Sequence, residues 1–250
     1  MHRKLENVHS HDELVAHRKS FFGKYEQHVP EFVYGGIDGA VTTFAVVAAS
    51  AGAELGAGVV LILGISNMLA DGLSMSVGSF LSTKSDLEHY DHIQAEEYEE
   101  TEVFPEEETE EIRKIYRDKG FEGEILEDIV AHIVADKDLW VAEMMVGEHD
   151  LIREDKNPSA NALMTFVSFC ILGFIPISPY VYAFVTKTDL PNAFTIACIS
   201  TAIAFAIIGY LKGAVNHTNK TRAVIETLVL GGIAAGVAYG VGDWLEKLIN

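Results

Sequence analysis

The chain has 250 residues, of which 49% are hydrophobic, yet its formal net charge is −19. A single soluble domain rarely combines these two properties, so the charges and the apolar residues are expected to lie in different parts of the chain. Of the 37 acidic residues, 25 lie between Lys84 and Lys156, together with only eight Lys or Arg. Such an acidic segment argues against nucleic acid as a partner and favours cations.

Five apolar segments lie outside this acidic region, and each is near or above the roughly 20 residues that a helix needs to cross the hydrocarbon core. The polar, mixed-charge start of the chain is unlike a secretory signal peptide, which favours a permanent first span. The sequence therefore predicts an all-α polytopic membrane protein with five transmembrane helices and a helical insert after the second. The expected spans are 32–53, 57–82, 160–185, 193–211 and 223–245.

The distribution of Lys and Arg predicts the orientation of the spans. Residues 1–30 hold five basic residues and the segment between the fourth and fifth spans holds three, whereas the loop 49–58 holds none. By the positive-inside rule, the N-terminal tail and the acidic insert lie in the cytosol. The tail, 1–30, is expected to contain a short amphipathic helix near 13–25 and five solvated histidines.

The acidic insert, 84–157, is predicted to fold as a small helical bundle between transmembrane segments at 31–83 and 158–250. The second span has no Pro or Gly after Gly78, so one helix is expected to run from 59 to 98 and to end outside the membrane. Pro105 and the acids after it start a second helix. Two more helices are expected at 123–135 and 137–152, where apolar residues recur at helical spacing.

Two further features belong to the third and fourth spans. Cys170 and Cys198 lie inside apolar runs and lack the spacing of a metal site, so both are expected to be packing residues. Pro176 and Pro179 are expected to break or kink the third span, which is tolerated where the freed backbone is buried or lines a cavity.

Four residues are candidates for a path through the membrane. Asp38 lies inside the first span, where an ionisable group is costly and suggests a function. It can bind a cation when ionised and a proton when not; the alternative is a helix-stabilising role near the interface. Asn67, Asp71 and Met75 follow at i, i+4 and i+8 on one stripe of the second span. A carboxylate with a thioether suits Fe²⁺ better than Ca²⁺ or Mg²⁺.

The acidic insert holds a second set of candidate ligands. Two E-x-x-E pairs, Glu97 with Glu100 and Glu108 with Glu111, each direct two carboxylates to one side of a helix. The alternative is a solvated acidic face, although like charges at this density destabilise a helix unless cations neutralise them. The insert holds no E-x-x-H motif, which counts against a di-iron oxidase site there. Other candidates in the insert are Met144, Met145 and Glu148, with His89, His92 and His149 as auxiliary ligands.

Four stretches of the sequence resemble the vacuolar iron transporter family. They are YGGIDGAVTTFAVVAASAGA, GISNMLADGLSMSVGSFLSTKSD, NPSANALMTFVSFCILGFIPISPY and LVLGGIAAGVAYGVGD. The Asp-Gly pair of the first and the ADGLSM pattern of the second are the most specific, and the resemblance covers nearly the whole chain from about Glu31. It implies five spans, a homodimer with the ion path at its interface, and export of Fe²⁺ from the cytosol coupled to protons.

The resemblance also implies which residues handle the metal. Asp38 and Met75 would line the path, and the cytosolic sites would use Glu97, Glu100, Glu108, Glu111, Met144, Met145 and Glu148. The predicted function is therefore proton-coupled export of Fe²⁺, and of Mn²⁺ or similar divalent metals, by a protein without prosthetic group or enzymatic activity. The expected location is a plasma membrane or a storage-organelle membrane. The alternatives are a membrane-anchored iron-oxidising di-metal enzyme and a Ca²⁺ or Mn²⁺ transporter on the same scaffold.

Overall fold

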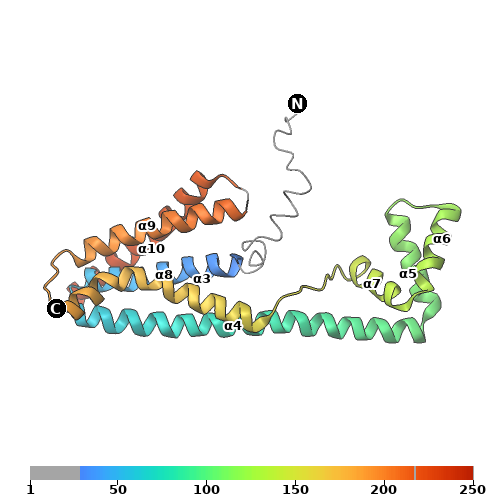
Figure 1. Ribbon diagram of the computed structural model, residues 1–250, viewed down its shortest axis with the longest axis horizontal. Helices are drawn as coiled ribbons and strands as arrows, with labels where there is room; N and C mark the ends of the chain where they lie inside the picture. Colours follow the sequence, from blue (N-terminus) through green and yellow to red (C-terminus); the bar gives the residue numbers. More distant parts are fainter. Residues whose placement is uncertain (1–28, 217, 250) are drawn as a thin grey trace, which may run out of the picture. The chain divides into compact units, whose positions relative to one another are not determined.

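The computed structural model describes residues 29–216 and 218–249 (Figure 1). The helix expected near 13–25 and the five N-terminal histidines lie outside these residues. Within them the chain forms helices and no strands. The helices are α3 (Val29–Gly52), α4 (Ala57–Val103), α5 (Pro105–Asp118), α6 (Gly123–Val134), α7 (Lys137–Gly147), α8 (Pro158–Thr186), α9 (Ala193–Val215) and α10 (Lys220–Ile249).

Five of these helices, α3, α4, α8, α9 and α10, are long and apolar enough to cross a membrane. This confirms the predicted all-α polytopic fold. The described residues form two compact units. The membrane unit combines those up to Phe80 with those from Pro158 onward, and the acidic unit is Leu81–Asn157. Since α4 is one helix of 47 residues, it contributes to both units.

In the membrane unit, α3 packs most extensively against α8 and also contacts α9 and α10. Two glycines beside Asp38 make the approach of α8 possible. A Cβ on Gly39 would lie 2.4 Å from the carbonyl oxygen of Phe169, and a Cβ on Gly35 would lie 2.8 Å from that of Thr165. Small residues at such positions let two helix backbones approach closely in lipid.

The third span was predicted to break or kink at its two prolines. The helix α8 is continuous from Pro158 to Thr186 and contains Pro176 and Pro179 in its interior. Both prolines are buried, and the expected break does not occur. Packing against neighbouring helices compensates for the backbone hydrogen bonds that prolines remove from a membrane helix.

Replacing Gly39 by Ala is expected to destabilise the membrane unit by about 1–3 kcal/mol, because the new methyl group would meet backbone that cannot rotate away. Gly78→Ala is the matched control, since no atom lies within 4 Å of its Cβ position. That variant should be as stable as wild type or slightly more stable, because Ala favours a helix over Gly. Thermal unfolding of the purified protein in detergent measures both, and equal stabilities would contradict the close α3–α8 contact.

The acidic unit has its own hydrophobic core, formed by α5, α6 and α7. The buried members of this core are Ile112, Leu126, Val130, Ile133, Trp140 and Met144. Its last helix is shorter than predicted, because α7 ends at Gly147 instead of continuing to 152. The chain turns away there: Asp150 adopts a left-handed backbone with φ 54°, and the Leu151 N–H donates to the Met145 carbonyl.

Candidate functional site

Three carboxylates of the acidic unit converge where α4 ends and α5 begins. Glu97 and Glu100 lie on the last turns of α4, and Glu108 lies on the first turn of α5. The short connection at Phe104 and the proline that starts α5 fold the second helix back. One carboxylate oxygen from each of these three residues lies within 4.8 Å of the others. That spacing allows the three to share a cation.

A second group shares Glu97. Glu97, Glu148 and His149 also place one ligand atom each within 4.8 Å of one another. His149 Nε2 lies 2.7 Å from Glu97 Oε1 and 4.0 Å from Glu148 Oε2. We call the following set the glutamate cluster: Glu97, Glu100, Glu108, Glu111, Glu148 and His149.

Two of these carboxylates are buried, which is unusual for a charge run. The exposed fraction is 2% for Glu97 and 6% for Glu108. Oε2 of each side chain is buried and has no hydrogen-bond partner. An ionised carboxylate in this position loses hydration without compensation, so a bound cation would stabilise it strongly. A solvated acidic face, the alternative from the sequence, does not account for these two oxygens.

Burial and the neighbouring charges raise the pKa values of three members of the cluster. Burial, with the charges of Glu97, Glu111, Glu100 and Glu148, raises the pKa of Glu108 to about 7. Burial and a hydrogen bond to Glu148 raise the pKa of Glu111. For His149, burial favours the neutral form, but the hydrogen bond to Glu97 and the surrounding carboxylates outweigh it and raise the pKa. Without a metal, Glu108, Glu111 and His149 therefore hold protons more tightly than isolated side chains do.

The metal-free acidic unit is expected to lose stability as the pH rises. The pKa of Glu108 is about 7 in the folded state and near 4.5 in the unfolded state. Protonation of Glu108 therefore makes its full contribution to the free energy of unfolding below pH 4.5. That contribution, about 3 kcal/mol at most, disappears as the pH rises through 7. Glu108→Gln should flatten the profile between pH 4.5 and 7. Hydrogen exchange of α5 and α6 amides in the chelator-treated full chain measures this stability at each pH. The same pH dependence in wild type and Glu108→Gln would refute the raised pKa of Glu108.

The other predicted ligands of the acidic unit are placed differently. Met144 is fully buried in the hydrophobic core, and Met145 is also fully buried. Their coordination of metal stays a prediction. His92, one of the three auxiliary candidates, pairs with Glu96 on the exposed side of α4. The sequence did not show which of His89, His92 and His149 lies near the glutamates. A helix expected up to residue 152 gave no sign of the turn that brings His149 to Glu97.

The candidate residues of the membrane path lie on α3 and α4. Asp38 and Asp71 are both partly buried, and their carboxylates are close enough to repel each other. Asn67 Nδ2 donates a hydrogen bond of 2.8 Å to Asp71 Oδ2, as their i, i+4 spacing permits. Met75 is partly buried and packs against a core cluster that includes Phe169 and Met68. Two carboxylates, one amide and one thioether therefore lie on two helices of the same unit.

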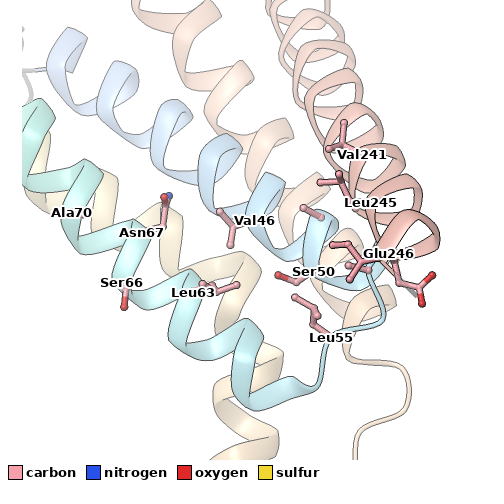
Figure 2. A pocket seen from close by; sticks show the side chains of 14 residues that line it. Val46, Ser50, Leu55, Leu63, Ser66, Asn67, Ala70, Val241, Leu245 and Glu246 are labelled. Carbon is pink, nitrogen blue, oxygen red and sulfur yellow. The ribbon is translucent and has the colours of Figure 1, made fainter.

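A cavity of about 790 Å³ opens between α3, α4 and α10 in the membrane unit. Figure 2 shows Asn67 on α4 and Leu245 on α10, with Val46 on α3 between them. The lining is mainly apolar, with a few polar side chains from Ser50, Ser66, Asn67 and Glu246. Of the four candidate path residues, Asn67 is the one that lines this cavity.

Comparisons with known proteins agree with these features. A sequence model of the VIT family matches residues 29–243. A protein of Toxoplasma gondii named vacuolar iron transporter is 33% identical over 240 residues, which cover 94% of this chain and 80% of that protein. Vacuolar iron transporter 1 of Tulipa gesneriana is 27% identical, covering 88% of each chain. Vacuolar iron transporter 1 of Arabidopsis thaliana is 29% identical, covering 84% of this chain and 83% of the relative.

Proposed function

The chain belongs to the VIT family and is therefore a membrane transporter of metal ions and not an enzyme. We propose that it exports Fe²⁺ from the cytosol in exchange for protons. The observation that carries this proposal is the glutamate cluster. Its two buried carboxylate oxygens lack hydrogen-bond partners, and a bound cation would stabilise them. In this proposal the acidic unit lies in the cytosol, as the distribution of Lys and Arg predicts, and collects the metal there.

The metal then crosses the membrane by way of Asp38 and Met75, assisted by Asp71 and Asn67. A carboxylate and a thioether together favour a borderline divalent ion over Ca²⁺. A carboxylate such as that of Asp38 can bind a cation when it is ionised and a proton when it is not, which is the requirement for exchange. Protonation of Asp38 on the far side releases the metal.

Three finer features belong to the same proposal. Mn²⁺ is a second substrate, because the oxygen ligands Glu97, Glu100 and Glu108 suit it as well as Fe²⁺.

The protein is a homodimer, and the apolar side chains that α4 exposes, such as Leu69 and Leu73, supply a surface for the partner. The membrane is that of a storage organelle, since the relatives are named for the vacuole.

Transport into proteoliposomes tests the exchange directly. With an acidic lumen and the acidic unit outside, Fe²⁺ uptake should exceed that of vesicles without a pH gradient by at least about tenfold, since each pH unit across the membrane contributes about 1.4 kcal/mol per proton. An ionophore that collapses the gradient should abolish the difference. Uptake that is equal with and without the gradient would refute proton coupling, and uptake that Ca²⁺ suppresses more strongly than Mn²⁺ does would refute the choice of metal.

A further inference from the structure

We propose that His149 is a nitrogen ligand of the metal in the acidic unit, and that with Glu97 and Glu148 it forms a mixed nitrogen–oxygen subsite that selects transition metals over Ca²⁺. This inference rests on the proposed function, because it assumes that the glutamate cluster binds the transported metal. It goes further by identifying the ligand that determines selectivity at that step.

The position of the imidazole fits coordination. Its Nε2, the atom that faces the carboxylates, lies 2.7 Å from Glu97 Oε1 and 4.0 Å from Glu148 Oε2. Ligands that bind one metal at about 2.0–2.2 Å lie about 3–4 Å from each other. The three side chains therefore need only small movements to surround one ion. When the ion is bound, the imidazole is neutral and carries its proton on Nδ1.

The backbone after α7 holds His149 in this place. The His149 N–H donates to the Met144 carbonyl at 3.4 Å, and the Leu151 N–H donates to the Met145 carbonyl at 2.8 Å. Between them Asp150 takes its left-handed conformation, which reverses the chain. These backbone contacts fix the place of the His149 side chain beside Glu97.

Glu97 gives an independent reason for an ion at this subsite. Its exposed fraction is 2%, and its hydrogen bond to His149 uses Oε1 alone. The second oxygen, Oε2, is buried without a partner. His149 itself is 28% exposed, so the subsite is open to solvent on the side of the ring. An ion can enter beside His149 and reach the oxygen that lacks a partner.

Imidazole changes which metals such a subsite prefers. Fe²⁺, Co²⁺ and Zn²⁺ bind imidazole nitrogen well, whereas Ca²⁺ and Mg²⁺ prefer oxygen ligands only. The neighbouring group of Glu97, Glu100 and Glu108 offers oxygen alone. Loss of His149 should therefore weaken the binding of transition metals and leave the binding of Ca²⁺ nearly unchanged.

Metal titration of the full chain in detergent tests this, with Co²⁺ as a stable stand-in for Fe²⁺ and Ca²⁺ as the comparison. His149→Ala is expected to lower the Co²⁺ affinity about 10- to 100-fold, a range typical when a metal's ligand environment is disrupted. The Ca²⁺ affinity should change less than about threefold. His149→Gln should behave like His149→Ala, because its amide N–H can still donate to Glu97 but supplies no imidazole nitrogen. His92→Ala, on the exposed side of α4, is the matched control and should bind both metals as wild type does.

X-ray absorption of the protein with one equivalent of Co²⁺ gives a second readout, in which outer-shell scattering from imidazole should be present in wild type and reduced in both His149 variants. Unchanged Co²⁺ affinity and unchanged scattering would overturn the role of His149 and leave the proposed function standing. An equal loss of Co²⁺ and Ca²⁺ in His149→Ala, restored by His149→Gln, would show that the residue only positions Glu97 and would also overturn the inference. A wild-type protein that binds neither metal would overturn the proposed function itself.

Discussion

Replacing Glu97 by Gln is expected to lower the affinity of the acidic unit for Fe²⁺ by about 100-fold or more, equivalent to about 2.7 kcal/mol. The effect should be this large because Glu97 is the one residue common to both groups of ligands, Glu97–Glu100–Glu108 and Glu97–Glu148–His149. It is also the most deeply buried acidic side chain of the described residues, so water cannot replace its oxygens as ligands. Anaerobic calorimetry with the full chain in detergent measures the affinity.

The control for this substitution is Glu99→Gln. Glu99 lies two residues away on the same helix, is exposed, and belongs to neither ligand group. Its neutralisation changes the net charge by the same amount, so it should lower the affinity by less than about threefold through long-range electrostatics alone. Metal-free Glu97→Gln should be at least as stable as wild type, because a buried charge without full compensation is removed. Equal affinities of the two variants would show that the cluster acts only as a diffuse acidic surface.

Asp38→Asn is expected to reduce Fe²⁺ transport into proteoliposomes by about 100-fold or more, to the rate of vesicles without protein. Asparagine keeps the size of the side chain but can neither neutralise a cation nor exchange a proton, so both halves of the exchange are lost. The affinity of the acidic unit for Fe²⁺ should remain that of wild type, since Asp38 belongs to α3 in the membrane unit. The two measurements together separate a defect in the path from a defect in metal collection.

Glu54→Gln serves as the control for Asp38→Asn. Glu54 is an exposed acidic residue in the turn between α3 and α4, outside the spans. Its transport rate should stay within about twofold of wild type, as expected for a surface substitution away from the path. Wild-type-like transport by Asp38→Asn would exclude Asp38 from the path, and Asp71 on α4 would then be the remaining candidate carboxylate of the path to test.

The sequence by itself determined the helices of this protein. Hydropathy and length located five spans, and the absence of Pro and Gly after Gly78 predicted that α4 continues well beyond the second span. Pro105 marked the start of α5, and the helix expected from 123 was found to begin there, at Gly123. These are local properties: a helix start, a helix stop and an apolar period depend on neighbours a few residues away.

The E-x-x-E spacing likewise indicated which glutamates share a helix face, although it did not decide which of them lose contact with water. In the structure Glu97 and Glu108 are buried, whereas Glu100 is exposed. Only the tertiary structure decides this, because burial depends on the helix that packs opposite and not on position within one helix. The same reason explains Met144, which the sequence offered as a ligand and which lies in the core formed by α5, α6 and α7.

The positions of His149 and Gly39 relative to other helices were also decided by the tertiary structure. A turn that ends α7 five residues before the predicted end brings the imidazole to Glu97, across 52 residues of chain. Position 39, beside Asp38, is occupied by glycine, and a Cβ there would collide with the backbone of α8. Sequence patterns specify which chemical groups are available on each helix. Which of them meet is determined by packing between segments far apart in the chain, where burial and repulsion act on groups that no local pattern relates.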